Sequence, residues 1–354
     1  MKNPLQYTHG HSRRDFLGGA AGASALGLGA AGLGATLLPA SAAAATELRM
    51  AFFASPRHPI WSKMMKPWGD MLEKANVGLD IKGFPGSQIG GRPPGAYKRI
   101  LGGVSDIEFH IPGYTSSVFP RTLVAEIPLQ WSSPELATRA LNRIYEKHLA
   151  PEYKRVKVLG MWTTDVPVVM TNKPVRTPDD LKGLKIRTPS RNQAAIIKGL
   201  GAVPVAMPMP STYGALEKGV VDGAIVGISV VNSFKLHEVV KHFIVDLPFG
   251  YSPFFIGMNR KRYNSLSAAQ KAAIDKNSGL DLGLLGARTY QAERERGIKT
   301  VEAKKGSSVT KLTAAEKAQW VERLTTVRDE WIARFEKSGL PYRDIYNAYM
   351  EGRS

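Results

Sequence analysis

The chain contains no cysteine among its 354 residues, and this absence removes several classes of protein from consideration. Without cysteine there can be no disulfide framework, no thiolate metal site, no iron–sulfur cluster and no cysteine nucleophile. Acidic residues are also scarce, because 30 Asp and Glu stand against 48 Lys and Arg, which gives a formal net charge of +18. Such an excess permits nucleic acid, an acidic surface or an anionic ligand as a partner and does not choose among them.

Length and composition are otherwise those of a folded globular protein. A chain of 354 residues is long enough for two domains. Hydrophobic residues make up 43% and charged residues 22%, and these values exclude a wholly disordered or collagen-like chain.

The N-terminal region has the pattern of an export signal. Residues 12–17 (Ser-Arg-Arg-Asp-Phe-Leu) are similar to the twin-arginine motif Ser/Thr-Arg-Arg-x-Phe-Leu, and no charged residue occurs from Phe16 to Thr46. Ala40 and Ala42 are the small residues that a signal peptidase recognises. We therefore predict a twin-arginine signal peptide at residues 1–42, recognised by the twin-arginine export machinery and cleaved near Ala42, and a periplasmic mature protein whose net charge falls to +16.

Two other interpretations of this region are possible. An uncleaved membrane anchor is the alternative, because the uncharged run is long enough to span a bilayer, but its glycine and alanine content favours cleavage. Residues 27–32 (Gly-Leu-Gly-Ala-Ala-Gly) fit the dinucleotide pattern G-x-G-x-x-G. They lack the preceding strand and following helix that this mechanism needs, so we predict no dinucleotide site.

From residue 48 the sequence alternates between strand-like and helix-like segments. Short apolar or alternating runs predict strands at residues 48–53, 79–84, 156–162, 184–187 and 203–205. Apolar residues at helical spacing, or cap residues, predict helices at residues 61–72, 134–149, 177–180, after Ser267, and from Thr313 to about Gly339. This alternation predicts an α/β fold with largely parallel sheets. The mature chain has no second hydrophobic run of membrane-spanning length.

The sequence contains no recognisable catalytic or metal-binding motif. There is no G-x-S-x-G elbow and no phosphate-binding loop. His237 and His242 are five residues apart, whereas a helical zinc site needs two histidines four apart. Basic residues are dispersed and do not interleave with aromatic ones. We predict no catalytic residue, no metal site, no cofactor and no nucleic-acid partner.

The most informative stretch runs from residue 171 to residue 223. A capped turn at residues 177–180 leads into a predicted strand that ends at Arg187, and Pro189 stops the strand directly after it. Open α/β sheets bind ligands at the carboxyl ends of their strands, so this arrangement places Arg187 where a ligand is expected.

The motifs of this stretch resemble those of the periplasmic solute-binding subunits of tripartite ATP-independent periplasmic (TRAP) transporters. Residues 179–189 are similar to that family's D-L-K-G-L-K-I-R-x-P signature, and residues 200–204 and 220–223 to its L-G-A-x-P and V-V-D-G signatures. Residues 86–91 resemble its G-x-Q-L-G-G turn, and together with residues 100–107 they extend the resemblance over nearly the whole mature chain.

The resemblance implies a two-domain periplasmic-binding-protein fold of the type II-like class, with hinge strands, a long C-terminal helix and a ligand cleft. Domain I would comprise residues 43–164 and 253–292, and domain II residues 165–252 and 293–354. It also implies a binding protein rather than an enzyme. Its partners would be a small organic acid and the small and large integral membrane subunits of the transporter.

By the same resemblance, Arg187 would form a bidentate pair with a ligand carboxylate, a geometry that lysine cannot reproduce. Several positions that are polar in family members binding sugar acids are apolar here, namely Phe53, Ile111, Pro167 and residues 224–226 (Ala-Ile-Val). A pocket without these polar groups should reject polyhydroxylated ligands. We therefore expect a monocarboxylate with an apolar or aromatic body.

The candidate ligand-binding set combines this arginine with nearby aromatic, apolar and polar side chains: Arg187, Phe53, Tyr114, His110, Trp162, Asp165, Met207, Tyr213, Val226 and Phe249, with His58 as a further polar contact. Two other functions stay open at this point. One is the binding protein of an ATP-driven transporter or sensor, and the other is a periplasmic enzyme on a two-domain α/β scaffold.

Overall fold

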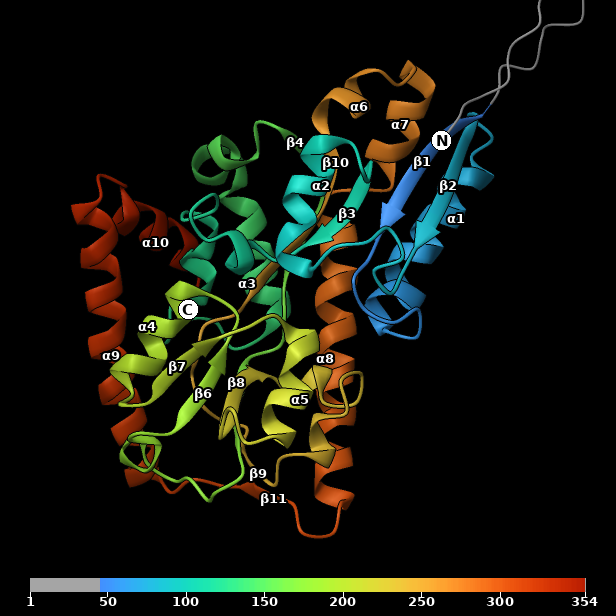
Figure 1. Ribbon diagram of the computed structural model, residues 1–354. Coiled ribbons are helices and arrows are strands. Elements are labelled where there is room, and N and C mark those ends of the chain that lie inside the picture. Colours follow the sequence, from blue (N-terminus) through green and yellow to red (C-terminus); the bar gives the residue numbers. More distant parts are fainter. Residues whose placement is uncertain (1–44, 354) are drawn as a thin grey trace, which may run out of the picture. The chain divides into compact units, whose positions relative to one another are not determined.

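The computed structural model describes residues 45–353, which contain two β-sheets with helices packed around them (Figure 1). The signal peptide predicted at residues 1–42 lies outside the described residues. The first sheet has the strand order β2 (Leu79–Phe84), β1 (Thr46–Ala51), β3 (Ile107–His110), β10 (Pro253–Asn259) and β4 (Val156–Thr163). The second has the order β11 (Ser308–Thr310), β9 (His242–Ile244), β5 (Pro167–Thr171), β8 (Gly223–Gly227), β6 (Lys185–Thr188) and β7 (Val203–Ala206).

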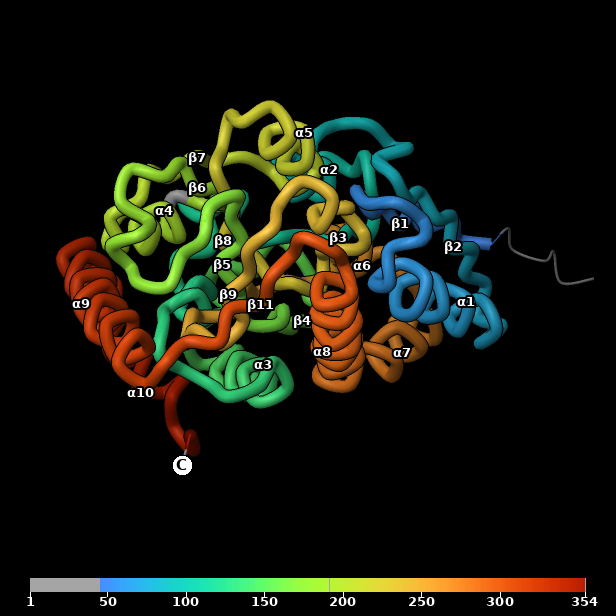
Figure 2. Tube along the Cα trace, turned by 90° about the horizontal axis from the view of Figure 1, so that it is seen from below, coloured from blue at the N-terminus to red at the C-terminus, as the bar shows by residue number. Residues whose placement is uncertain are grey.

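The helices of the described residues are α1 (Lys66–Lys74), α2 (Ala96–Gly102), α3 (Pro134–Arg143), α4 (Arg191–Gly199), α5 (Thr212–Glu217), α6 (Arg260–Asn264), α7 (Ala268–Lys276), α8 (Leu280–Ala303), α9 (Ala314–Lys337) and α10 (Tyr342–Met350). In two perpendicular views, α9 lies against α4 and α3 lies beside α8 (Figures 1 and 2). Within the described part of the chain, no helix is both long and apolar enough to cross a membrane.

The sheets are mixed, which corrects the expectation of largely parallel sheets. In the first sheet β10 runs antiparallel to both of its neighbours, β3 and β4, and in the second sheet β5 runs antiparallel to β8 and β9. The other neighbouring strands pair in parallel. β5 directly follows β4 of the first sheet, and β10 directly follows β9 of the second. In each sheet, the antiparallel strand is therefore the one that directly follows, in sequence, a strand of the other sheet.

Local sequence signals account for the starts of three helices. Ser133 caps α3 by accepting a hydrogen bond from the Leu136 N–H, and Ser267 and Thr313 form the predicted capping boxes at α7 and α9. The helix expected at residues 134–149 is interrupted, because α3 ends at Arg143 and residues Tyr145–Leu149 form a separate π-helical turn.

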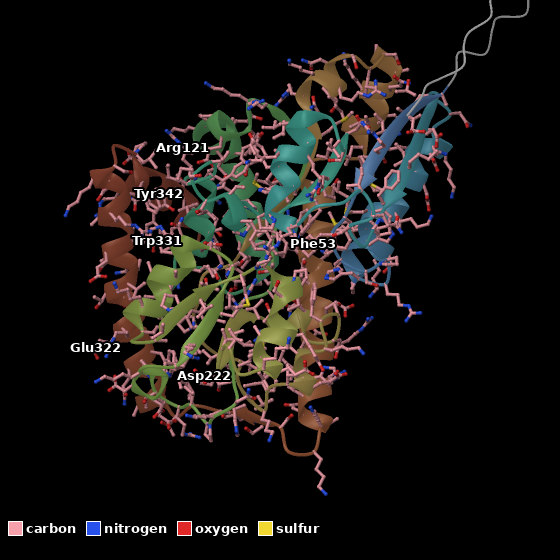
Figure 3. All side chains as sticks on the ribbon, viewed as in Figure 1. Phe53, Arg121, Asp222, Glu322, Trp331 and Tyr342 are labelled. Carbon is pink, nitrogen blue, oxygen red and sulfur yellow. The ribbon has the colours of Figure 1, made fainter. Side chains whose placement is uncertain are left out.

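The helix predicted from Thr313 to about Gly339 is confirmed as α9, and its apolar residues lie on one stripe. Trp320, Leu324 and Trp331 are buried on one side of the helix. The Trp331 Nε1–H donates to the Tyr342 hydroxyl over 3.2 Å. Figure 3 shows Trp331 and Tyr342 on the inner side of α9, whereas Glu322 points outward. The period of the sequence pattern therefore decides which face of α9 is buried.

Helix α8 packs closely on both sheet regions because it carries glycine where the backbones approach. A Cβ added at Gly286 would lie 2.7 Å from the Trp162 indole, and one at Gly297 would lie 2.5 Å from the Ile228 carbonyl oxygen. Trp162 belongs to β4 of the first sheet, whereas Ile228 follows β8 of the second. The domain boundary expected near residue 292 falls inside this continuous helix.

Candidate functional site

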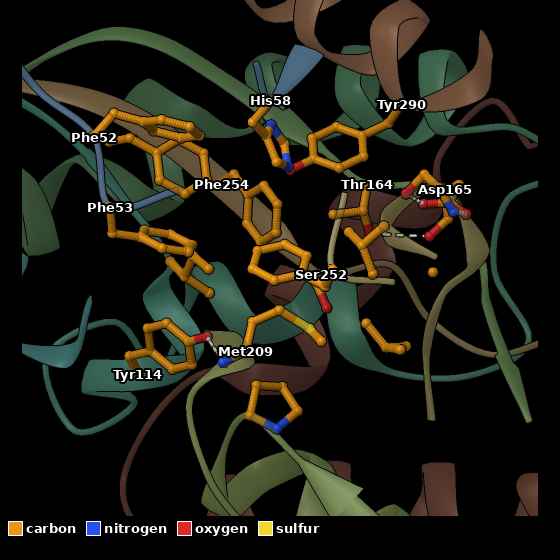
Figure 4. Close-up of a pocket in the computed structure, with 18 of the residues that line it drawn as sticks. Phe52, Phe53, His58, Tyr114, Thr164, Asp165, Met209, Ser252, Phe254 and Tyr290 are labelled. Atoms are coloured by element: carbon orange, nitrogen blue, oxygen red, sulfur yellow. Dashed lines mark hydrogen bonds between the residues drawn. The ribbon is translucent and has the colours of Figure 1, made fainter. Parts of the chain in front are cut away.

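A pocket with an empty volume of about 570 Å³ lies where strand ends of the two sheets meet (Figure 4). Residues that follow β1, β4 and β6, and residues at the ends of β3 and β8, line it. Because parallel strands end at one edge of their sheet, these segments converge from both sheets on the same space. The antiparallel strand β10 contributes its first residues instead, through Ser252 and Phe254.

Seven of the residues that line the pocket are phenylalanine or tyrosine. The rings of Phe52 and Phe109 lie 5.2 Å apart, those of Phe53 and Phe109 5.7 Å, and those of Phe109 and Phe254 5.2 Å. These contacts include edge-to-face arrangements of the kind that aromatic pairs prefer. The phenylalanine rings present only faces and edges to the pocket and offer no group that can hydrogen-bond to a hydroxyl.

Arg187 supplies a cation to this apolar space. Its residue is 1% exposed, and burial lowers the pKa of its guanidinium. The Nε–H and an Nη2–H both donate to the Met207 carbonyl oxygen, over 3.1 and 2.9 Å. A guanidinium has five N–H donors, so three remain for another partner. Within the part of the chain that the structure describes, no carboxylate lies within 4 Å of Arg187. The site thus holds a buried positive charge without a counter-charge.

Tyr114 lies beside Arg187 and links the two sheet regions. The residue belongs to the 3-10 turn Pro112–Thr115 after β3, and its hydroxyl oxygen accepts the Met209 N–H over 2.9 Å. Met209 follows β7 of the second sheet. Since the oxygen of Tyr114 is the acceptor in this bond, its own O–H can still donate. Arg187 and Tyr114 together can offer several donors to one anion.

Asp165 is a fully buried carboxylate in the same pocket. It accepts hydrogen bonds from the backbone N–H and the hydroxyl of Ser229. Arg294 lies 3.9 Å from it, and this guanidinium also donates to the carbonyl oxygens of Val166 and Val245. Burial raises the pKa of Asp165 to about 6, because the surrounding protein solvates its charge less well than water does. The pocket therefore has one anionic wall.

A second buried carboxyl group lies behind the pocket. Gln193 donates to Glu126 over 3.0 Å and to the Ser252 hydroxyl over 2.9 Å, and Ser252 lines the pocket. Ser190 also donates to Glu126, over 3.3 Å. Burial raises the pKa of Glu126 to about 8, so this carboxyl group is protonated at neutral pH. Glu126 ends the 3-10 turn Thr122–Glu126, which precedes α3 in the sequence. The hydrogen bond from Gln193 connects this turn to the start of α4.

The structure brings together half of the predicted side chains. Arg187, Tyr114, Asp165, Val226 and Phe53 all line the pocket. The additional polar candidate His58 lines it too.

The other predicted residues do not line it, and strand geometry explains the position of His110. His110 neighbours Phe109 on β3, and successive strand residues point to opposite faces, so His110 packs instead against Phe119 and Phe255. Trp162 is fully buried behind the wall, against Phe109 and Phe254.

Three further corrections concern the second sheet region. Met207 contributes its backbone carbonyl oxygen to Arg187, and the side chain that lines the pocket is that of Met209. The Tyr213 hydroxyl donates to Glu238 over 3.1 Å, away from the pocket. Phe249 packs on Trp320 and lines a different, smaller cavity.

The predicted set omitted residues from several elements: Phe52, Phe109, Thr164, Pro189, Met209, Ser229, Phe234, Phe254 and Tyr290. Phe52 and Pro189 directly follow the observed strands β1 and β6, so the rule that ligands bind at strand ends would have found them if the ends of these strands had been predicted correctly. Tyr290 lies in the middle of α8, and no sequence signal marks it. Among the described residues, no group of three or more His, Asp or Glu side chains is placed to hold a metal ion.

Two mixed sheets that meet at an apolar pocket with a buried, uncompensated cation are the architecture of a protein that binds a small solute. The chain belongs to family 7 of the bacterial extracellular solute-binding proteins, DctP, whose model matches residues 50–334. It is thus a TRAP periplasmic solute-binding protein. Members of this family are binding components of transporters and are not enzymes.

Three relatives illustrate the similarity. A TRAP solute-binding protein from Rhodoferax ferrireducens, solved with copurified benzoate, is 30% identical with a TM-score of 0.82, over 86% of this chain and 96% of that one. A marine metagenome protein specific for aromatic acids, solved with 3-hydroxybenzoate, is 29% identical with a TM-score of 0.83, over 87% and 98%. The C4-dicarboxylate-binding periplasmic protein DctP of Rhodobacter capsulatus is 28% identical over 330 residues, 91% of this chain and 95% of that one.

Proposed function

We propose that this protein captures an aromatic monocarboxylate and delivers it to the membrane subunits of a TRAP transporter. The observation that carries this proposal is the buried guanidinium of Arg187, which lacks a counter-charge and opens into a pocket walled by phenylalanine rings. A buried charge without a partner is costly, so a carboxylate that enters this pocket is strongly favoured. In our proposal the carboxylate pairs with the remaining donors of Arg187 and accepts the Tyr114 O–H.

The aromatic body of the ligand follows from the wall. Phe52, Phe53, Phe109 and Phe254 offer edges and faces to a flat ring, and stacking of this kind adds about 0.5–1.5 kcal/mol per pair beyond the burial of apolar surface. Two of the similar solved structures hold benzoate and 3-hydroxybenzoate, which supports the same choice. A sugar acid would bury several hydroxyls against these rings without partners.

The buried carboxylate of Asp165 favours a ligand with one carboxylate over a ligand with two. A second carboxylate of the ligand would meet this buried acid, and its nearest cation, Arg294, is already engaged by Asp165 and two backbone carbonyls. Two carboxylates that share a buried site cannot both ionise without cost. The C4-dicarboxylate specificity of one relative is therefore not expected here.

The mechanism would be one of capture and closure. We propose that each sheet belongs to one domain, with residues 43–164 and 253–292 in domain I and residues 165–252 and 293–354 in domain II. The two would close on the ligand about the segments that join the sheets. The closed form would then dock on the small and large membrane subunits. The twin-arginine signal and its cleavage near Ala42 complete the proposal, because they would deliver the protein to the periplasm.

The proposal is tested by calorimetric titration of the mature protein, refolded to remove any copurified ligand. Benzoate, succinate and glucuronate represent the aromatic, dicarboxylic and sugar-acid classes. We expect benzoate to bind at least 100-fold more tightly than the other two. Tight binding of succinate or glucuronate, or no binding of any aromatic acid in a wider panel, would show the proposal to be wrong. Mass spectrometry of small molecules released from the unrefolded protein provides a second, unbiased readout.

A further inference from the structure

Two polar side chains of the pocket, His58 and Tyr290, are not among the donors that the proposed function assigns to the ligand carboxylate. His58 and Tyr290 line the pocket and are only 7% and 4% exposed, and their ring centroids lie 6.4 Å apart. Figure 4 shows the hydroxyl end of Tyr290 directed toward the His58 ring, at the opposite side of the drawn pocket from Tyr114. Polar groups that are buried this deeply normally have hydrogen-bond partners.

The hydrogen bonds of His58 determine which ring nitrogen carries the proton. Nδ1 accepts the Ile60 N–H over 3.2 Å, so it bears no hydrogen. Burial lowers the pKa of His58 to about 4, which makes the ring neutral near pH 7. In a neutral imidazole with an accepting Nδ1, the hydrogen resides on Nε2. Hydrogen bonds between described residues engage His58 through Nδ1 and leave this Nε2–H donor for another group.

Tyr290 is neutral as well. Burial raises the pKa of its hydroxyl well above the ordinary value, and Asp165 acts in the same direction. Its hydroxyl can donate one hydrogen bond and accept others. No hydrogen bond joins this hydroxyl to another side chain or to the backbone within residues 45–353. The pair thus presents two donors and one acceptor oxygen, all uncharged.

The surroundings select what this pair can bind. Phe254 lies 5.5 Å from the Tyr290 ring, and Phe52 and Phe234 lie 5.3 and 6.0 Å from the His58 ring. A ring held against these side chains would bring a substituent to the pair. The nearby carboxylate of Asp165 disfavours a substituent that is an anion. The chemistry that remains is a neutral group that both donates and accepts, which describes a hydroxyl.

We propose that His58 and Tyr290 form a second subsite of this pocket, which binds an uncharged hydroxyl group at the end of the ligand remote from its carboxylate. This inference rests on the proposed function and narrows the ligand to hydroxylated aromatic acids. The hydroxyl would donate to the oxygen of Tyr290 or accept the Nε2–H of His58, and it would satisfy groups that an unsubstituted ring leaves without partners.

The test compares each parent acid with its hydroxylated forms. Calorimetric titrations use benzoate with 2-, 3- and 4-hydroxybenzoate, and phenylacetate with 3- and 4-hydroxyphenylacetate. We expect at least one hydroxylated acid to bind about tenfold more tightly than its parent, the gain of one net buried hydrogen bond. In Tyr290→Phe the ratio should fall to about 1. If the parent acids bind but no hydroxylated acid binds more tightly than its parent, the proposed subsite is wrong and the proposed function stands. If no acid binds at all, both are wrong.

Two further variants keep the result interpretable. His58→Asn can retain an acceptor for the Ile60 N–H while it removes the Nε2–H, so it provides the same test if Tyr290→Phe does not fold. Phe53→Leu is the matched control, because it removes ring contacts without removing a polar group. It should weaken the parent and the hydroxylated acid by the same factor and leave their ratio unchanged. A ratio that falls equally in Phe53→Leu and Tyr290→Phe would overturn the inference.

Discussion

The aromatic pocket and a second hollow of the molecule make an instructive contrast. The second hollow, here called the outer groove, has an empty volume of about 1270 Å³, more than twice that of the pocket. Its lining includes four cations, Arg139, Arg143, Lys157 and Arg260, where the pocket has Arg187. By size and charge alone, the outer groove would be the better anion site.

The cations of the outer groove already have partners. Arg139 pairs with Glu135 over 2.9 Å and Lys157 with Asp275 over 2.8 Å. Arg143 donates to the carbonyl oxygens of Ala348, Tyr349 and Glu351, and Arg260 donates to those of Tyr153 and Val156. Exposed pairs of this kind contribute little energy, and water competes for them. Arg187 also donates to a carbonyl oxygen, that of Met207, but unlike these exposed or half-buried cations it is buried, and no carboxylate of the described residues lies within 4 Å of it. Burial and lack of compensation therefore matter more than the number of charges.

The largest expected effect is on ligand affinity. Arg187→Met should weaken the binding of benzoate by about 30-fold or more, since loss of one partner of a buried charge pair costs about 2–5 kcal/mol. Arg260→Met in the outer groove should change the affinity by less than twofold. Calorimetric titration of both variants beside the wild type checks this. Equal losses in the two variants would mean that the outer groove takes part in binding.

The next effect concerns pH and compares two carboxyl groups. Glu126, behind the pocket, has its pKa raised to about 8 by burial, whereas hydrogen bonds from Arg288 and Arg139 lower that of the exposed Glu135 to about 2. The folded state keeps the Glu126 proton up to about pH 8, and the unfolded chain loses it near pH 4.5. The native state thus binds more protons in this window, and the contribution of Glu126 to stability falls as pH rises through it.

Urea unfolding measures this effect. Between pH 6.5 and pH 8.0 the free energy of unfolding of the wild type should fall by about 2 kcal/mol more than that of Glu126→Gln. The Glu135→Gln variant should follow the wild type over the same range, because Glu135 stays ionised in both states. A wild-type profile parallel to that of Glu126→Gln would show that Glu126 does not titrate as proposed.

A smaller effect is expected on the stability of the ligand-free protein, with opposite signs in the two regions. Arg187→Met replaces an uncompensated buried cation by an apolar side chain of similar length, so it should raise the free energy of unfolding by about 1 kcal/mol or more. Arg260→Met removes donors to the carbonyl oxygens of Tyr153 and Val156 and should lower it by about 1 kcal/mol. Urea unfolding without ligand distinguishes these signs. If Arg187→Met is less stable than the wild type, the hydrogen bonds from Arg187 to the Met207 carbonyl oxygen stabilise the fold by more than the burial of its charge costs.

The smallest effect concerns salt. Raising NaCl from 50 to 500 mM should weaken benzoate binding by less than about threefold, because buried pairs are screened much less than exposed ones. The net charge of the mature protein, +16, would then contribute chiefly to the association rate. A loss of tenfold or more would assign a direct role to exposed cations such as those of the outer groove.

Sequence-based predictions succeeded where the interactions join residues close in sequence and failed more often where they join distant ones. Caps at Ser133, Ser267 and Thr313 depend on residues three positions apart, and all three are confirmed. The position of Arg187 in the pocket was also predicted, because it ends a strand within a recognisable motif. His110 was placed in the pocket wrongly: its neighbour Phe109 faces the pocket, and the period of a strand is two, so an error of one residue reverses the face.

Other parts of the site depend on contacts that no local pattern encodes. Tyr290 reaches the pocket from α8, more than 200 residues after Phe52, and only the packing of that helix beside β4 brings them together. The reversed directions of β5 and β10 follow from how the chain passes between the sheets. Neither the position of Tyr290 nor the direction of these two strands can be predicted from the periodicity of a single segment.

The sequence by itself determined the absence of cysteine chemistry, the excess of basic residues, the α/β character of the chain and the place of Arg187 at a strand end. Only the tertiary structure decided which cation of the described residues is buried without a counter-charge and which rings surround it. The physical reason is that composition counts charges, whereas the energy of a charge depends on its burial and its partners. One arginine of the 48 basic residues is set apart by its surroundings and not by its type.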